Sequence, residues 1–238
     1  MAFIRIQGAV RPRPPMAQIS VQRMLDVTIS AVGLAALAPI ILCIAFAILI
    51  QSGRPIFFSQ VRLGAGGRYF RIHKFRKFRN ISGVSDRPVT LTNDARMTAL
   101  GRFLYKTKLD ELPQLWNILK GDMSIVGPRP ESLQLSDCFV GRYLDILDHR
   151  PGIFGPNQIL FVNECCLYPE GEDPQQFYRE VLFPLKASVD LAYFRDRTVL
   201  SDFRWIAQGV LATLGWRSSL EAKSIEAVRA YLRRDDIG

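Results

Sequence analysis

Two adjacent carboxylates, Asp110 and Glu111, stand directly before a segment with the sequence pattern of a helix. Pro113 suits the first turn of that helix, and Gly121 suits its end. The N-terminus of a helix favours negative charge, because its first N–H groups are free and its dipole is positive there. The pair can therefore serve the helix alone, which is the usual role of such a pair. Alternatively, one carboxylate is a nucleophile or base and the other holds Mg²⁺.

Basic residues around this pair could compensate its charge and receive phosphate groups. Adjacent carboxylates raise each other's proton affinity unless cations lie nearby, and Arg102, Lys106 and Lys108 precede the pair. Downstream, Arg129 stands between two prolines, which stiffen the backbone and present the guanidinium from an extended segment. A planar guanidinium held in this way suits bidentate recognition of a phosphate. The same segment could also be a structural turn in which Arg129 pairs with a carboxylate.

A β-hairpin is predicted upstream, because two stretches rich in aromatic and branched residues, 56–63 and 69–76, flank the glycine-rich segment 64–67. The segment lacks the Gly-Lys-Ser/Thr sequence of a phosphate-binding loop, so we interpret it as a turn only. The second strand carries Lys74 and Arg76 and continues into a basic and aromatic stretch. Beside a membrane segment, such a stretch favours contact with lipid headgroups or with an anionic substrate. A solvated basic face is the plain alternative.

The positive charge of the chain is concentrated in its first third. The chain has 31 Lys and Arg against 22 Asp and Glu, a net charge of +9. Residues 1–80 contain 12 of the basic residues and one acid, Asp26, whereas residues 81–238 contain 19 basic and 21 acidic residues. This asymmetry argues against a uniformly basic surface for nucleic acid, and we expect no nucleic-acid partner. The four cysteines match no zinc or redox spacing and are interpreted as free thiols.

An apolar run of 22 residues without a charge, Ile29–Ile50, precedes the hairpin. As a helix it would be about 33 Å long, close to the hydrocarbon thickness of a bilayer. Pro39 lies at its midpoint and should kink the helix into two legs of about 15 Å each. Both flanks of the run are basic, which favours a re-entrant hairpin with both ends at the anionic inner leaflet. A kinked single span is the alternative.

Three further helices are predicted from apolar spacing and capping, at 97–105, 181–193 and 198–214. The last two are interpreted either as amphipathic helices at the membrane interface or as ordinary core helices. The fold class that follows is α+β, a mainly helical monotopic membrane protein with a re-entrant helix, a small β-hairpin and interfacial helices. We expect four regions: a flexible basic tail (1–16), a re-entrant membrane helix-hairpin (17–53), a cytosolic catalytic domain (54–216) and a charged C-terminal helix or tail (217–238).

The stretch 98–131, TALGRFLYKTKLDELPQLWNILKGDMSIVGPRPE, resembles the signature of the bacterial sugar transferases, the monotopic polyprenyl-phosphate phosphoglycosyl transferases. The resemblance extends over about residues 17–215 and includes the helix with Pro39, the Lys-Phe-Arg element at 74–76 and the Arg-Pro-Gly-Ile element at 150–153. LDELPQ and GPRP in this order are far more specific than either block alone. The chain resembles the minimal catalytic form of the family. Residues 154–178 depart from the usual pattern and could shape a different sugar pocket.

The resemblance implies a reaction and a role for each candidate residue. Asp110 would attack the β-phosphate of a UDP-sugar and expel UMP, and polyprenyl (undecaprenyl) phosphate would then take the phosphosugar from the aspartate. Glu111 would take part in catalysis by binding the Mg²⁺ cofactor. Arg129 would bind phosphate or nucleotide. The other candidate substrate-binding residues are Lys74, Arg76, Arg102, Lys106 and Lys108.

The resemblance also implies a place in the cell and in metabolism. The enzyme would act at the cytoplasmic face of the bacterial inner membrane, in contact with anionic inner-leaflet lipids, and a homo-oligomer is a possible assembly. It would catalyse the initiating step of exopolysaccharide, capsule, O-antigen or glycoprotein glycan synthesis. Two other functions compete: a membrane glycosyltransferase that releases UDP, and a non-catalytic membrane-anchored basic adaptor. The sequence names neither the sugar nor the pathway.

Overall fold

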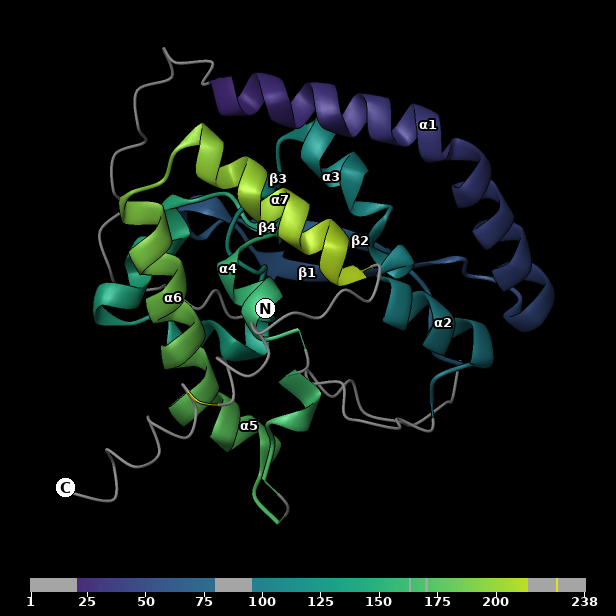
Figure 1. Cartoon of the computed structure of the whole chain (residues 1–238). Coiled ribbons are helices and arrows are strands. Elements are labelled where there is room, and N and C mark those ends of the chain that lie inside the picture. Colours follow the sequence, from purple (N-terminus) through teal and green to yellow (C-terminus); the bar gives the residue numbers. More distant parts are fainter. Residues whose placement is uncertain (1–20, 80–95, 163, 170, 214–225, 227–238) are drawn as a thin grey trace.

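The computed structural model describes most of the chain between the two terminal segments (Figure 1). The predicted tail at 1–16 lies outside the described residues, and so does the predicted C-terminal segment apart from one residue. The described residues are 21–79, 96–162, 164–169, 171–213 and 226.

One long helix, α1 (Val21–Ser52), contains the apolar run, with Pro39 inside it. Figure 1 shows that α1 is bent: its first half runs along α3 and its second half turns toward α2. A proline inside a helix removes one backbone hydrogen bond and crowds the preceding turn, which accounts for a bend at this place. The apolar run thus forms one continuous, bent helix with Pro39 inside it.

Both halves of α1 pack on the folded body, but most of its apolar surface stays uncovered. Ile29 and Leu34 in the first half pack against a cluster around Ile118, and Ile44 and Ile48 in the second half are buried in another cluster. Within the described residues, α1 is the helix that is long and apolar enough to cross a membrane, and only 11% of its 18-residue apolar window is buried. This exposure is the opposite of what a core helix of a soluble protein requires.

The predicted hairpin is confirmed as strands β1 (Phe57–Leu63) and β2 (Tyr69–Phe75), which pair antiparallel. The turn between them contains a short 3₁₀ turn, η1 (Ala65–Gly67), in which Gly66 has a φ of 65°. A residue with a Cβ rarely adopts this conformation. Arg76 N–H donates to the carbonyl of Ile56 at 2.9 Å, so the pairing extends one step beyond β2.

The candidate catalytic stretch folds largely as predicted. Helix α2 (Ala99–Thr107) begins at Thr98, whose hydroxyl accepts a hydrogen bond from Gly101 N–H at 2.8 Å. A short 3₁₀ turn, η2 (Leu109–Glu111), connects it to α3 (Gln114–Lys120), which ends at Gly121. Trp116 on α3 is apolar but 54% exposed.

A second pair of strands, β3 (Ser124–Val126) and β4 (Gly152–Phe154), was not predicted from the sequence. The strands are parallel and join segments that are distant in the chain. They approach so closely that a Cβ at Gly127 would lie 2.1 Å from the carbonyl oxygen of Arg150. Strands of three residues are too short to show an alternation of apolar and polar residues, so the sequence does not predict them.

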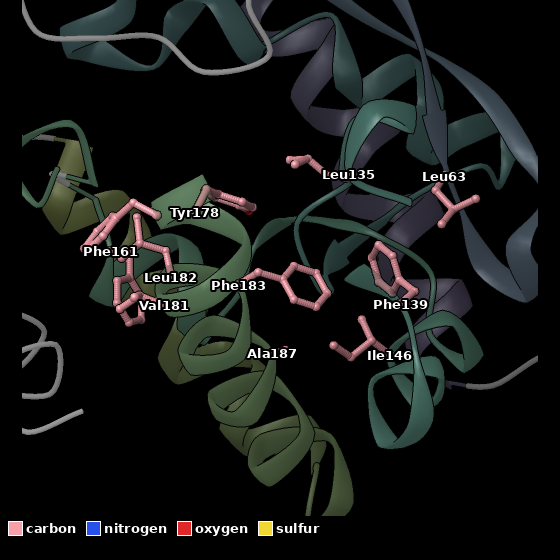
Figure 2. Packing of buried hydrophobic residues seen from close by; sticks show 11 residues of the cluster. Leu63, Leu135, Phe139, Ile146, Phe161, Tyr178, Val181, Leu182, Phe183 and Ala187 are labelled. Carbon is pink, nitrogen blue, oxygen red and sulfur yellow. The ribbon is translucent and has the colours of Figure 1, made fainter. Parts of the chain in front are cut away.

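The remaining elements form a helical layer around the largest hydrophobic cluster. Figure 2 shows this cluster, in which Phe183 lies between the side chains of Leu182 and Phe139. The predicted helices near the C-terminus are confirmed, and the second of them exposes Leu200, Phe203, Val210 and Leu211. The elements are η3 (Leu133–Cys138), η4 (Gly141–Asp148), α4 (Pro156–Leu160), η5 (Glu164–Cys166), α5 (Pro174–Phe177), the π-turn η6 (Tyr178–Leu182), α6 (Phe183–Arg195) and α7 (Val199–Thr213).

Candidate active site

The two carboxylates that define the site lie on η2, between α2 and α3, and each is paired with a different lysine. Asp110 is 1% exposed, and Lys77 Nζ lies 3.4 Å from its Oδ2. The other oxygen of Asp110, Oδ1, is buried and has no hydrogen-bond partner among the described residues. Glu111 Oε1 accepts a hydrogen bond from Lys74 Nζ at 2.6 Å. The side chains therefore differ, because Asp110 has one free oxygen and Glu111 is held directly by a cation.

Lys108 makes the turn that places the pair. It has a φ of 57° and is the one non-glycine residue with a positive φ in the part of the chain that the structure describes. This left-handed conformation ends α2 and begins η2. It costs an L-residue about 1–2 kcal/mol, because Cβ approaches the following carbonyl oxygen. Strain of this kind persists only where surrounding contacts maintain it, and it is concentrated at functional sites.

This strain predicts an unusual order of stabilities. Lys108→Gly should have a free energy of unfolding about 1 kcal/mol higher than Lys108→Ala, because glycine adopts a positive φ without the Cβ contact. Both variants lack the lysine charge, so their difference isolates the backbone effect. Thermal unfolding in the same detergent measures it. A Lys108→Ala protein that is as stable as Lys108→Gly would show that the turn relaxes at no cost.

The cations around Glu111 set its protonation. Burial lowers the pKa of Lys74 to about 8, although Glu111 opposes this shift. Burial by itself would raise the pKa of Glu111, but Lys74, Lys108 and Arg129 together hold it well below its usual value. Burial also lowers the pKa of Lys108, again against the attraction of Glu111. Glu111 is therefore a firmly ionised carboxylate, and Lys74 is a cation that mildly alkaline conditions can neutralise.

Arg129 joins the site to a second polar network. Arg129 is exposed. Partial desolvation of its guanidinium would lower its pKa, but the carboxylates of Glu111, Glu164 and Glu131 raise it. Glu131 accepts a hydrogen bond from the Tyr178 hydroxyl at 2.7 Å. The guanidinium is thus permanently charged and lies where several acidic groups attract it.

The second network is built on Lys186, which is 3% exposed. Lys186 Nζ donates to Glu164 Oε2 at 2.7 Å and to the Tyr178 hydroxyl at 3.1 Å. Glu164 also accepts from the Tyr168 hydroxyl at 2.9 Å. Sequence reasoning did not find this network, because its members come from η5, η6 and α6 and share no spacing. It occupies part of the segment 154–178, where the sequence departs from the family pattern.

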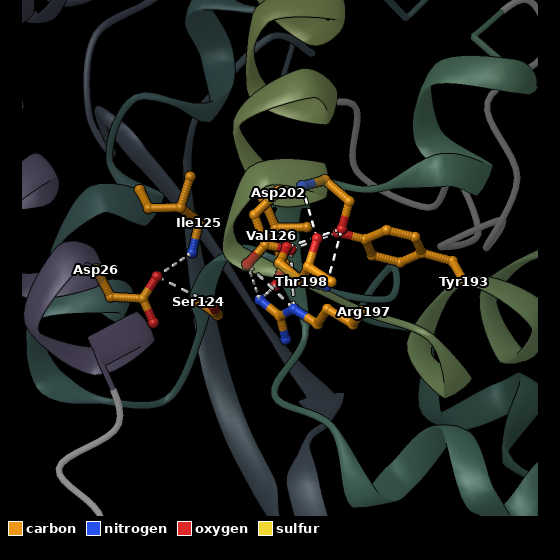
Figure 3. Close-up of polar contacts among 9 residues, drawn as sticks. Asp26, Ser124, Ile125, Val126, Tyr193, Arg197, Thr198 and Asp202 are labelled. Carbon is orange, nitrogen blue, oxygen red and sulfur yellow. Dashed lines mark hydrogen bonds and ion pairs between the residues drawn. The ribbon is translucent and has the colours of Figure 1, made fainter.

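Side chains of α1 hold β3, the strand that leads to Arg129 (Figure 3). Asp26 Oδ1 accepts hydrogen bonds from Ser124 Oγ at 3.0 Å and from Ile125 N–H at 2.8 Å. Arg23, on the same helix, donates to the carbonyls of Ile118 and Leu119 at the end of α3. The start of α1 is therefore attached to two elements of the site.

The same strand is also held from α7. Arg197 Nη2 donates to the carbonyl of Val126 at 3.0 Å and forms an ion pair with Asp202 at 2.8 Å. Figure 3 shows this arginine between β3 and the N-terminal turn of α7, with the Tyr193 hydroxyl also directed at Asp202. Contacts from α1 and α7 thus fix the direction in which the chain enters the Pro-Arg-Pro segment.

Some of the predicted substrate-binding residues lie beside Asp110 and Glu111, and others have different partners or are exposed. Lys74, Lys108 and Arg129 lie close enough to Glu111 to lower its pKa. Arg76 instead donates to the carbonyls of Ser52 and Gly53, both at 2.7 Å, at the end of α1. Its guanidinium is therefore occupied within the fold, and we leave it out of the proposed substrate site.

The two basic residues predicted on α2 are exposed. Arg102 Nη1 donates to the carbonyl of Met97 at 3.1 Å, and Lys106 lies on the exposed side of the helix. Lys77 was not among the predicted site residues, although its position in the basic stretch after β2 was a signal for it.

The residues present suit a Mg²⁺ ion that is shared with a substrate. Among the described residues, no group of three or more His, Cys, Asp and Glu side chains could hold a metal ion. Mg²⁺ is commonly bound by one or two carboxylates together with substrate phosphates, and it keeps several waters. An ionised Glu111 beside Asp110, with its unpartnered buried oxygen, fits that donor set. Glu111 would hold the ion, and the phosphates would complete its ligands.

Known proteins resemble this chain over most of its length. The sequence model of a family described as bacterial sugar transferase matches residues 17–215. A UDP-N-acetylgalactosamine-undecaprenyl-phosphate N-acetylgalactosaminephosphotransferase from Aeromonas hydrophila is 33% identical over 204 residues, which are 82% of this chain and 47% of that protein. A UDP-glucose:undecaprenyl-phosphate glucose-1-phosphate transferase from Caulobacter vibrioides is 38% identical over 156 residues, 63% of this chain and 58% of that protein. This chain thus spans about half the length of these two relatives.

The matched region contains every element that builds the site, from α1 through η2 to α7. The long apolar helix and the undecaprenyl-phosphate enzymes among its relatives also make this a membrane-associated protein. The resemblance seen in the LDELPQ and GPRP blocks is confirmed, and the chain belongs to the bacterial sugar transferase family.

Proposed function

We propose that this protein transfers a phosphosugar from a UDP-sugar to polyprenyl phosphate and releases UMP, as the initiating step of a bacterial glycan. The observation that carries the proposal is the pair of buried Asp110 and partly buried Glu111, with Lys74, Lys77 and Lys108 close to it. Two anionic substrates that react through a carboxylate need such cations to reduce their mutual repulsion. The names of the relatives, which are undecaprenyl-phosphate sugar-phosphate transferases, support the same reaction.

In the first step, Asp110 acts as the nucleophile. An oxygen of its carboxylate forms a bond with the β-phosphorus of the UDP-sugar, and the bond from this phosphorus to the bridging oxygen breaks. UMP leaves with the electron pair, so no proton needs to be supplied. Asp110 Oδ1 is shielded from solvent, and a substrate phosphate therefore reaches it only when neighbouring side chains move aside.

In the second step, a phosphate oxygen of polyprenyl phosphate attacks the same phosphorus. The bond between phosphorus and Asp110 breaks, the carboxylate is regenerated and the product is a polyprenyl-diphosphate sugar. Arg129 and Lys108, which lie close enough to Glu111 to lower its pKa, would bind the phosphates in both steps. A bound Mg²⁺ would neutralise phosphate charge near Glu111.

The bent α1 suits a lipid substrate. We propose that α1 enters the cytoplasmic leaflet of the inner membrane and returns to the same face, because Pro39 divides it and both of its flanks are basic. The exposed apolar residues of α7 and the exposed Trp116 would lie at the membrane interface. This arrangement would bring the phosphate of the lipid to the site while its chain stays in the bilayer.

The nucleotide product tests the function. The full chain in detergent, with Mg²⁺ and polyprenyl phosphate, is expected to release UMP with at least one UDP-sugar of a panel. The panel should include UDP-glucose and UDP-N-acetylgalactosamine, since the two relatives differ in this sugar. UDP as the product would identify a glycosyltransferase that moves the sugar alone. Release of neither nucleotide with any sugar would favour the non-catalytic adaptor.

A further inference from the structure

Lys77 lies two residues after β2, and its ammonium group forms an ion pair with Asp110. Its Nζ lies 3.4 Å from Asp110 Oδ2 and 4.5 Å from the centre of the Tyr105 ring. The side chain is 15% exposed, so water screens this ion pair only weakly. An ammonium above an aromatic face is attracted to it electrostatically. Lys77 is thus held between a ring on α2 and one oxygen of the carboxylate.

The main chain of Lys77 is fixed by the same helix. Its carbonyl oxygen accepts a hydrogen bond from Thr98 N–H at 3.0 Å, at the start of α2. A Cβ at Gly101 would lie 2.1 Å from this oxygen, so α2 packs directly on the backbone of Lys77. The position of the ammonium group is therefore set by packing, which is how positioned charges act most effectively in enzymes.

The two oxygens of Asp110 have different surroundings. Oδ2 is paired with Lys77, whereas Oδ1 is buried and has no hydrogen-bond partner among the described residues. A carboxylate oxygen that is paired with a cation is a weaker nucleophile than one that is not. The buried position also prevents free rotation of the side chain, because each rotated state would have to displace packed neighbours.

We infer that Lys77 is a positioning residue for the reaction, and that it holds Oδ2 of Asp110 so that Oδ1 attacks the phosphorus. The inference rests on the proposed function. In the covalent intermediate, Oδ1 is bonded to phosphorus and Oδ2 becomes the carbonyl oxygen, which Lys77 polarises. In the second step the carboxylate is the leaving group, and its negative charge returns beside the ammonium. Lys77 therefore assists both the formation and the discharge of the intermediate.

The test measures each half-reaction in single turnover. Lys77→Met removes the charge and keeps an unbranched side chain, and Lys77→Arg keeps the charge. We expect Lys77→Met to slow both the formation and the discharge of the covalent intermediate by about 100-fold, the usual effect of losing one preorganised charge. The KM for the UDP-sugar should change less than threefold. Lys77→Arg should recover most of both rates.

Lys120→Met is the matched control, because Lys120 is exposed on α3 and forms an ion pair with Asp122. It should leave both rates unchanged. Thermal unfolding of each variant separates a folding defect from a chemical one. If Lys77→Met forms the intermediate at the wild-type rate, or if both Lys77 variants lose thermal stability and activity together, Lys77 has no positioning role. Failure of the wild-type protein to release UMP would instead overturn the proposed function.

Discussion

Asp110→Asn is expected to abolish the covalent intermediate and to reduce UMP release by at least about 1,000-fold. An asparagine amide has nearly the same shape as the carboxylate but is a very poor nucleophile toward phosphorus. The substitution therefore removes the reacting group while the buried packing of η2 remains. Intact-protein mass spectrometry after mixing with a UDP-sugar measures the intermediate, and a nucleotide assay measures UMP.

The control for this variant is Asp122→Asn. Asp122 is also an aspartate beside a lysine, but its partner Lys120 lies on the surface at the end of α3. It should form the intermediate at the wild-type rate. Asp110→Asn leaves Lys77 without its carboxylate partner, so thermal unfolding should show that the variant is folded at the assay temperature. If Asp110→Asn still accumulates a covalent phosphosugar, the nucleophile is another residue and the assignment is wrong.

The rate of the first step is expected to fall above about pH 8, by about tenfold for each pH unit. Burial lowers the pKa of Lys74 to about 8, so this lysine is charged below that pH and neutral above it. Glu111, Arg129, Asp110 and Lys77 are the charged groups that act on it. When Lys74 loses its proton, Glu111 loses its cationic partner and the site loses one positive charge. Binding and reaction of a dianionic diphosphate should both become less favourable.

Lys74→Arg tests the origin of this alkaline limb. A guanidinium keeps its proton over the accessible range, so the limb should disappear even if the maximal rate is lower. Single-turnover formation of the intermediate between pH 6.5 and 9.5 avoids any effect of the lipid phosphate on the profile. Lys120→Arg, a substitution at an exposed site, should keep the wild-type profile. A wild-type rate that stays constant to pH 9.5, or a limb that persists in Lys74→Arg, would assign the dependence to another group.

Much of the local architecture was predictable, because the signals for it act within a few residues. Pro39 inside the apolar run, the glycine turn of the hairpin and Gly121 at the end of α3 each restrict the backbone where they stand. The position of Asp110 and Glu111 before a helix follows from the same kind of signal. These features require no knowledge of how the elements pack.

The partners of the charged residues were less predictable. Arg76 and Lys77 are neighbouring cations in one basic stretch. The sequence favoured Arg76 for the substrate site, yet Arg76 binds carbonyls at the end of α1 and Lys77 reaches Asp110. The difference arises because consecutive residues of an extended segment point to opposite sides, and packing decides what lies on each side. The strained φ of Lys108 is another consequence of packing, since lysine does not favour it.

The sequence by itself determined the chemistry that is available: a carboxylate pair at a helix start, a rigid Pro-Arg-Pro segment and a bent apolar helix. The tertiary structure alone decided which cation serves which carboxylate, and it revealed the network of Lys186 and Glu164 near Arg129. The physical reason is the separation along the chain between the groups that interact. Capping and backbone restriction depend on neighbours in the chain, whereas ion pairs between buried groups depend on distances of a few ångströms between segments far apart in sequence.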